Sequence, residues 1–235
     1  MRFTMLGSAA VILLAAGPVP GAVPPDALVP VDSGTIVVKG VVAIPASPDI
    51  FGTVALGAGV TAYGARWRRV SAADEFDPRV RALAADAAAA AAGGDPLARL
   101  AAVNAEVGRR IRWRRDLETY HVADYWAQAG ETLTRGEGDS EDIAILKMQV
   151  LKAAGFSPRD IYLSVGRDKL RGAHSLLLVR IGPDFYALDA RNPLPVRAAE
   201  GMRFKPVITL GRNAAWVHGR RIAVRHARTA TPALR

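Results

Sequence analysis

The segment of this chain richest in reactive side chains is residues 136–142, which read GEGDSED. Its glycines give a flexible approach, and acidic residues then stand where the pattern predicts the start of a helix. Free backbone N–H groups at a helix N-terminus favour negative charge, so Asp139 or Ser140 would be the cap. Taken alone, the segment indicates only a well-formed helix start.

Two residues further along the chain supply possible chemical partners. His174 begins a predicted strand and Asp189 ends the next one. A two-residue hairpin loop at 182–183 would pair Leu176 with Asp189. Asp189 then lies diagonally across from His174 on the same face, within reach of a His–carboxylate hydrogen bond. Ser140, His174 and Asp189 would thus form a nucleophile, a base and its orienting group. Considered separately, His174 is a satisfied strand-end histidine and Asp189 a turn residue.

The elements that must position these residues follow from sequence periodicity. Helices are predicted at 78–92, 96–111 and 140–154, from proline starts, strong helix formers and apolar residues at helical spacing. Residues 114–137 are predicted to be a loop region. Strand-like runs occur at 35–42, 160–165, 174–181, 185–188, 206–210 and 221–224. Helices first and antiparallel strands afterwards predict an α+β fold.

The N-terminus has the layout of a secretory signal. Arg2 gives a positive start, residues 5–16 are an apolar run, and small and turn-forming residues follow. A spanning helix would need about 20 apolar residues. We therefore expect a periplasmic or secreted protein, the alternative being an uncleaved anchor. The expected parts are a signal peptide at 1–22, an extended lead-in at 23–60 (with an edge strand at 35–42), one domain at 61–226 and a disordered tail at 227–235.

Composition narrows the classes of protein. Half of the 235 residues are hydrophobic, enough for one domain with a core, and the absence of cysteine excludes disulfides, thiolate metal sites and a thiol nucleophile. The net charge of +9 is concentrated in arginines at 66–69, 109–115 and 220–225. Such clusters suit nucleic acid or an anionic envelope surface, or they form a solvated face. No nucleic-acid-binding motif accompanies them, so nucleic acid is disfavoured.

Residues 124–189 resemble the LapG-like bacterial transglutaminase-like cysteine peptidases. The motifs that carry the resemblance are Asp124-Tyr125-Trp126, Gly138-Asp139-Ser140-Glu141-Asp142, Lys147, Leu151, Ala173-His174 and Leu188-Asp189, with outlying matches at Phe51-Gly52, Arg66-Trp67, Val103-Asn104 and Trp216. The resemblance implies a papain/transglutaminase-like fold, with N-terminal helices packed on an antiparallel sheet. It also implies an endopeptidase that acts on a protein or peptide in the cell envelope, controlled by calcium and by an inner-membrane receptor.

Carried over residue by residue, the resemblance places Ser140 at the nucleophile position, His174 as the base and Asp189 as its orienter. The family's calcium-binding carboxylates flank the nucleophile, which implies Ca2+ at Asp139 and Glu141, helped by Asp142. Hard carboxylate oxygens suit this ion. Without an ion, the same acids would simply complement the helix dipole.

Serine at position 140 is the main departure from the family, which has its catalytic cysteine there. A thiol beside a helix N-terminus and a histidine is readily ionised, whereas a hydroxyl needs concerted proton removal and a matched oxyanion hole. Further departures are Asp189-Ala190 in place of Asp-Asn and Gln128-Ala129 in place of Thr-Pro. We expect a family member with impaired peptidase activity. The alternatives are a working serine hydrolase and an inactive calcium-bound pseudopeptidase that binds a peptide or partner; an engineered Cys-to-Ser exchange would leave the same sequence.

Overall fold

A computed structural model describes residues 28–31, 35–38, 47–59, 61–72, 76–170, 172–199 and 202–220. The chain divides into two units, Met1–Ile44 and Pro45–Arg235. In the first, β1 (Leu28–Val31) and β2 (Thr35–Val38) form a two-stranded antiparallel sheet, so the strand predicted at 35–42 is present in part and pairs with β1. The predicted signal peptide, the strand at 221–224 and the tail at 227–235 lie outside the described residues.

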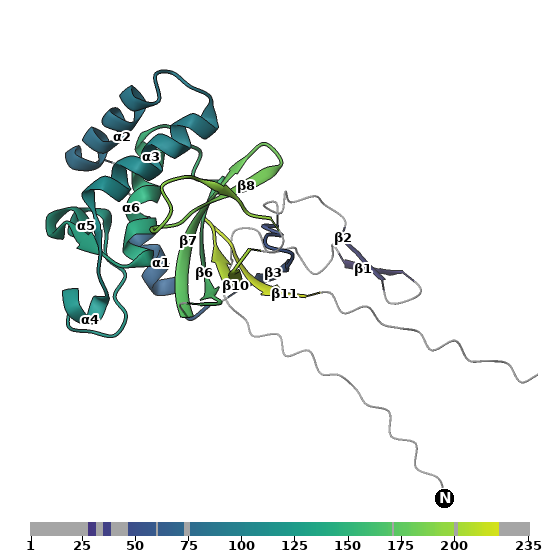
Figure 1. The fold of residues 1–235 in the computed structure, drawn as a ribbon. Helices are drawn as coiled ribbons and strands as arrows, with labels where there is room; N and C mark the ends of the chain where they lie inside the picture. Colours follow the sequence, from purple (N-terminus) through teal and green to yellow (C-terminus); the bar gives the residue numbers. More distant parts are fainter. Residues whose placement is uncertain are drawn as a thin grey trace, which may run out of the picture. The chain divides into compact units, whose positions relative to one another are not determined.

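The second unit is built on a seven-stranded sheet in the order β3-β11-β10-β6-β7-β8-β9, antiparallel throughout (Figure 1). Its strands are β3 (Val54–Ala58), β6 (Ile161–Asp168), β7 (Gly172–Ile181), β8 (Asp184–Leu188), β9 (Val196–Arg197), β10 (Phe204–Leu210) and β11 (Ala215–Gly219). Because β3 pairs with β11, the sheet takes in residues that the sequence assigned to the lead-in at 23–60. The domain therefore begins earlier than residue 61.

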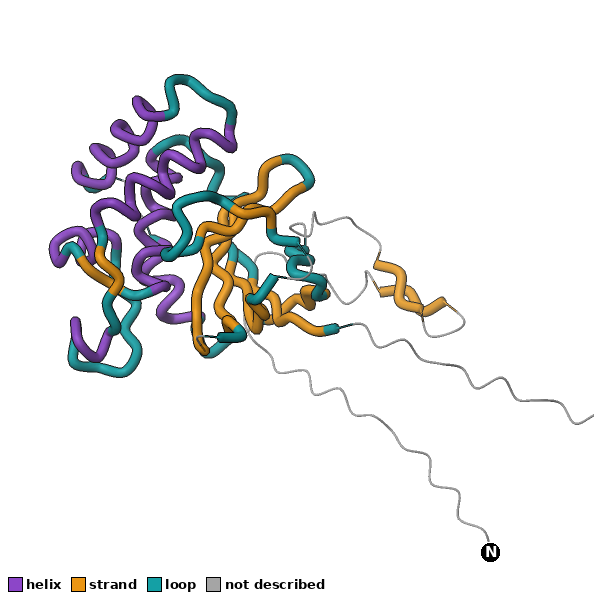
Figure 2. Tube along the Cα trace, viewed as in Figure 1, coloured by secondary structure: helices purple, strands orange, loops and turns teal. Residues whose placement is uncertain are grey.

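Helices cover one side of this sheet (Figure 2). They are α1 (Gly64–Ser71), α2 (Pro78–Ala90), α3 (Pro96–Arg110), α4 (Asp116–Thr119), α5 (Ala129–Arg135) and α6 (Ser140–Ala153). The three predicted helices are confirmed as α2, α3 and α6, and α6 packs between β7 and the pair α2 and α3. None of the helices in the described ranges is long and apolar enough to cross a membrane.

The predicted loop at 114–137 is where the sequence interpretation was wrong. It contains α4, α5 and β5 (Glu137–Gly138), which pairs in parallel with β4 (Arg112–Trp113). Helix α5 begins with a Gln128–Glu131 capping box and ends at Gly136, whose φ of 66° is left-handed. Helices this short carry too few apolar repeats for a periodicity argument to find them. Helix α1 and strands β3 and β11 were also missed.

The core lies on both faces of the sheet. Alternate residues of β7 belong to two clusters: Leu177 and Val179 face the helices, while Leu176 and Leu178 pack with Tyr162 and other residues on the opposite face. Burial on both faces explains the continuous apolar run in this strand. By the same alternation, His174 shares the face of Leu176.

Candidate active site and acidic cluster

The site is built where β7 extends beyond its neighbour β8. The pairing of the two strands ends at Leu177 and Leu188, which leaves the edge of β7 open at residues 172–176. The first residue of α6, Ser140, occupies this edge. Its Oγ accepts a hydrogen bond from the backbone N–H of Ser175 at 3.1 Å and donates one to Glu141 Oε2 at 3.0 Å.

His174 and Asp189 form the predicted pair. The hairpin register is as expected, with Ile181 opposite Asp184, and His174 Nε2 lies 3.0 Å from Asp189 Oδ1. His174 is buried and meets the ring of Phe204 edge-on. With Nε2 engaged by Asp189, Nδ1 is the ring nitrogen that remains for proton transfer.

The link between Ser140 and His174 is weaker than triad logic requires. The structure brings Ser140 to the backbone of Ser175, the neighbour of His174, but neither hydrogen bond of the Ser140 hydroxyl goes to the imidazole. The hydroxyl proton is directed instead to the carboxylate of Glu141. The predicted pair of base and orienter is therefore in contact, and the predicted nucleophile lies beside it without a direct hydrogen bond.

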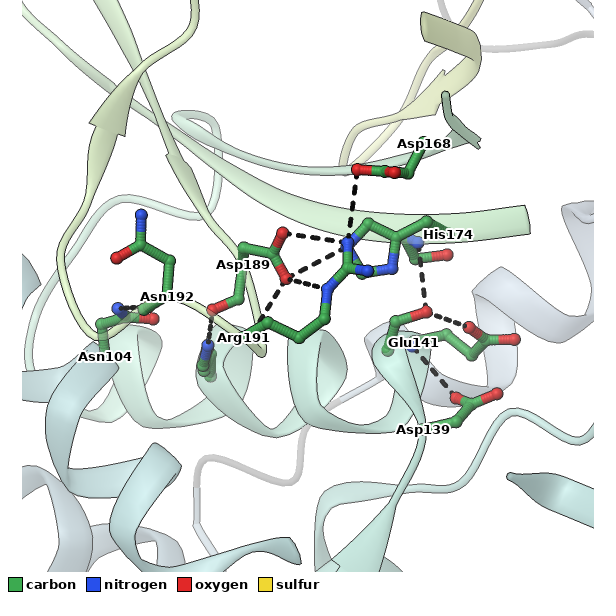
Figure 3. Close-up of polar contacts among 11 residues, drawn as sticks. Asn104, Asp139, Glu141, Asp168, His174, Asp189, Arg191 and Asn192 are labelled. Atoms are coloured by element: carbon green, nitrogen blue, oxygen red, sulfur yellow. Dashed lines mark hydrogen bonds and ion pairs between the residues drawn. The ribbon is translucent and has the colours of Figure 1, made fainter. Parts of the chain in front are cut away.

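Arg191 is a participant that sequence reasoning missed. Its backbone N–H and Nε donate to Asp189 Oδ1 at 2.9 and 3.2 Å, and one terminal nitrogen lies 3.2 Å from Oδ2 (Figure 3). The same terminal nitrogen lies 3.7 Å from Asp168. Although burial opposes it, the hydrogen bonds from His174 and Arg191 hold the pKa of Asp189 well below its usual range. No local pattern distinguishes this arginine from the others in the chain.

The start of α6 is held by its own acidic residues. Asp139, one of the two predicted candidates, is the N-cap and accepts the backbone N–H of Glu141 at 3.1 Å. Asp142 is fully buried, and its Oδ1 accepts the backbone N–H of Ala127 at 2.7 Å. A Cβ at Gly138 would come within 2.7 Å of Asp142 Cβ, so glycine is needed where the chain enters the helix.

Asp116 completes an acidic cluster that the sequence did not reveal. Carboxylate oxygens lie within 4.8 Å of one another in two sets that share this residue: Asp116, Asp139 and Asp142, and Asp116, Asp124 and Glu141. Asp116 Oδ2 accepts the N–H of Tyr125 at 2.6 Å, but its buried Oδ1 has no partner among the described residues. A cluster of hard oxygen donors with an unused buried oxygen fits a divalent cation.

Electrostatics at this cluster point the same way. Burial raises the pKa of Asp142 to about 7 and that of Asp116 to about 6. Burial and the neighbouring carboxylates Glu141 and Asp142 raise the pKa of Asp139. The protein thus gathers acids that repel one another. Asp116 lies in the segment predicted to be a loop, so only the tertiary fold brings it to Asp139.

Many of the arginines in the predicted basic clusters form ion pairs within the protein. Arg66 pairs with Asp124, Arg69 with Glu131, Arg109 and Arg110 with Glu106, and Arg112 and Arg114 with Glu137. The acidic partners of Arg109 and Arg112 are largely buried while these arginines stay exposed. These arginines therefore form ion pairs that connect segments of the fold. Binding of the clusters to an anionic surface stays a prediction.

Helices packed on an antiparallel sheet, with Ser140 at a helix N-terminus beside a His–Asp pair on the sheet, define a transglutaminase-like fold. The family model of the bacterial transglutaminase-like cysteine proteinases (BTLCP) matches residues 77–203, and the chain belongs to this family. Its serine occupies the place of the family's cysteine. No curated protein sequence matches the chain.

Solved structures of LapG from Legionella pneumophila are similar to this chain. The calcium-bound form is 26% identical, with 50% of this chain and 66% of LapG covered and a TM-score of 0.46. The EGTA-treated form is 21% identical, with 68% and 87% covered and a TM-score of 0.48. A TGase structure is 10% identical, with 60% and 45% covered and a TM-score of 0.40. The chain thus spans just under two thirds of calcium-bound LapG.

Proposed function

We propose that this protein is an exported member of the family whose peptidase activity is strongly impaired by serine at position 140, and whose site still receives a protein or peptide of the cell envelope. The observation that carries the proposal is the direction of the Ser140 hydroxyl, which donates to Glu141 rather than to His174. A serine nucleophile depends on a base that removes its proton as it attacks. Because the Ser140 hydroxyl proton is bound by the Glu141 carboxylate, His174 is not placed to remove it.

The second candidate is a pseudopeptidase that acts only by binding, with an inner-membrane receptor among its partners. It is favoured by the same hydrogen bond, together with the second one from Ser175 N–H, since both hold the hydroxyl in place without chemistry. The two candidates differ only in residual catalysis, so a single experiment separates them.

That experiment replaces the hydroxyl by a thiol. In Ser140→Cys, the helix N-terminus and His174 should stabilise a thiolate, because such settings lower a thiol pKa from about 8.5 to about 3.5–7.5. Alkylation by iodoacetamide at pH 6 should then be about tenfold or more faster than for free cysteine, and His174→Ala in the same background should remove the excess. Peptide cleavage by Ser140→Cys, and not by the unmodified protein, would support impaired catalysis.

Two other results would decide against this view. If the thiol introduced by Ser140→Cys reacts like free cysteine, the nucleophile and base are not aligned, which leaves the binding module. Cleavage by the unmodified protein that disappears in Ser140→Ala would identify a working serine hydrolase.

We propose further that the acidic cluster binds Ca2+. Asp116 would supply an oxygen ligand together with Asp139 and Asp142 or together with Asp124 and Glu141, the two sets of carboxylates that lie close enough to share an ion. The fit rests on the unpaired buried oxygen of Asp116 and on the mutual repulsion of the acids. One of the similar structures is LapG in a calcium-bound form. A bound cation would neutralise the carboxylates around Ser140 and order the start of α6.

Export completes the proposal, on the basis of the N-terminal signal pattern. Mass spectrometry of envelope fractions should find a mature N-terminus between residues 17 and 24. A cytoplasmic chain that retains Met1 would overturn this part and leave the assignment of the site unaffected.

A further inference from the structure

A cavity of about 360 Å³ lies beside the loop that follows β8. It is lined by residues of α3, by Lys147 of α6 and by residues 189–193, and it is open to solvent on one side. In Figure 3, Asn104 and Asn192 of this region lie on one side of Asp189, and His174 lies on the other. The cavity is at the lower end of the about 300–1,000 Å³ typical of small-ligand pockets. Asp189 and Arg191 belong to both the cavity and the candidate active site, whereas the other lining residues have no part in the site described above.

Lys147 is the buried cation of this cavity. Only 1% of the residue is exposed, and its Nζ donates to the backbone carbonyl of Asp189 at 3.1 Å. An ammonium group has three N–H donors, and this is its one hydrogen bond within the described ranges. Burial lowers the pKa of Lys147 to about 8, which reflects a positive charge with little compensation.

Asn104 lines the same cavity and has an unused acceptor. It is also 1% exposed, and its Nδ2 donates to the carbonyl of Asn192 at 2.8 Å. This hydrogen bond orients the amide, and Oδ1 is left buried without a partner among the residues that the structure describes. Buried acceptors are normally paired, so an N–H or O–H from outside the chain is expected here.

The charges around the cavity define its occupant. Its lining includes the cations Lys147, Arg109 and Arg191 and one anion, Asp189. Arg109 is paired with Glu106, and Arg191 with Asp189 and Asp168, so Lys147 is the lining cation without a carboxylate partner among the described residues. The surplus is positive, so a carboxylate is the complementary group. An occupant that also satisfied Asn104 would carry an N–H near its carboxylate, as an acidic residue in a peptide does.

We propose that this cavity binds an acidic side chain of a peptide segment, with the carboxylate on Lys147 and Arg109 and the backbone N–H on Asn104. Lys147 and Ser140 are seven positions apart on α6, so they lie on one face, roughly 10 Å apart along the axis. An extended peptide covers this distance in about three residues. The preferred segment thus has Asp or Glu about three positions from the residue at Ser140. The choice of a peptide rests on the proposed function.

The test measures binding and needs no catalysis. Fluorescent decapeptides with a single Glu placed in turn at each position of an alanine–serine background are titrated against the unmodified protein by anisotropy, alongside matched Gln peptides. Glu at the favoured position should tighten binding at least tenfold over Gln. Lys147→Met should abolish the preference.

Arg109→Gln tests the site with little disturbance of the interior, because this side chain is 63% exposed and the buried Glu106 keeps Arg110 as its partner. Arg110→Gln is its matched control, since Arg110 also pairs with Glu106 and is 51% exposed but does not line the cavity. Arg109→Gln should reduce the Glu preference at least fivefold and Arg110→Gln should leave it unchanged. Equal binding of Glu and Gln peptides, or equal effects of the two variants, would overturn the proposal.

Competition by free glutarate shows whether the cavity takes the side chain of a peptide or a free small carboxylate. Weak competition, at least a hundredfold poorer than that of the Glu peptide, is expected for a peptide site. Competition at concentrations similar to those of the peptide would overturn the peptide assignment in favour of a free carboxylate. Because binding is measured on the unmodified protein, these outcomes are independent of the alkylation of Ser140→Cys that tests the impaired-peptidase proposal.

Discussion

Helix α6 contributes to two regions that bury charged groups of opposite sign, an acidic cluster at its start and a cavity around Lys147. The acidic cluster, made of Asp116, Asp124, Asp139, Glu141 and Asp142, concentrates carboxylates at the start of the helix. The lysine cavity, seven positions along, buries one ammonium beside Asn104. Burial works against charge in both regions: it raises the pKa of Asp142 and lowers that of Lys147.

The regions differ in what their charged groups do for the fold. Asp139 and Asp142 accept backbone N–H groups, so this part of the acidic cluster is needed for the helix start whether or not an ion is present. Lys147 makes a single hydrogen bond to a backbone carbonyl, and Asn104 keeps an unused acceptor, among the residues that the structure describes. The acids therefore serve structure and ion binding together, whereas the lysine cavity has more donor and acceptor capacity than the fold requires.

The largest effect is expected at Asp142. Asp142→Ala leaves the buried N–H of Ala127 unpaired and removes half of the capping box, which should lower the free energy of unfolding by about 4 kcal/mol. Asp142→Asn keeps an acceptor oxygen and removes a repelling charge, so its loss in EGTA should be under about 1 kcal/mol. Urea denaturation measures both. Equal losses would mean that charge, rather than hydrogen bonding, holds this residue.

Burial of Lys147 should change how the free energy of unfolding depends on pH above about pH 8. The folded-state pKa of Lys147 is about 8, below its ordinary value of 10.5. Between these values the unfolded chain binds more protons, so stability rises with pH. The protein should therefore gain up to about 3 kcal/mol over Lys147→Met between pH 8 and 10.5. Parallel pH profiles for the two proteins would show that the ammonium is compensated after all.

Calcium should act on the acidic cluster alone. At a hundredfold excess over its dissociation constant, the ion should stabilise the fold by about 2.7 kcal/mol, or roughly 5–10 °C in melting temperature. Asp116→Asn should reduce this response, while Asp86→Asn, an exposed control outside the cluster, should keep it. A melt that is indifferent to calcium and EGTA would leave these acids as helix-end charges.

The smallest effect concerns Arg191, which lines the lysine cavity and pairs with Asp189. In the Ser140→Cys background, Arg191→Gln should leave Asp189 to pair more fully with His174, which favours a thiolate–imidazolium pair. Alkylation at pH 6 should accelerate by less than tenfold, about 1 kcal/mol. Slower alkylation would show instead that Arg191 positions Asp189 for His174.

The sequence alone was sufficient for the elements whose signals are local. Helices α2, α3 and α6 follow from proline starts, caps and apolar repeats, because each pattern is complete within a few turns. The β7–β8 register follows from its two-residue loop, so the contact between His174 and Asp189 could be predicted without a structure. The sequence narrowed the cap of α6 to Asp139 or Ser140, and the structure has Asp139.

The tertiary structure decided everything that depends on chain segments meeting from a distance. Asp116 joins Asp139, Arg191 pairs with Asp168, and Asn104 contacts the loop after β8, although none of these residues stands out in its own sequence neighbourhood. The tertiary structure also sets the hydrogen bonding of the Ser140 hydroxyl. The pairing of β8 with β7 ends before Ser175, so the Ser175 N–H is available to donate to Ser140 Oγ. Periodicity reports which face of an element is buried, but only packing decides which other segment covers it.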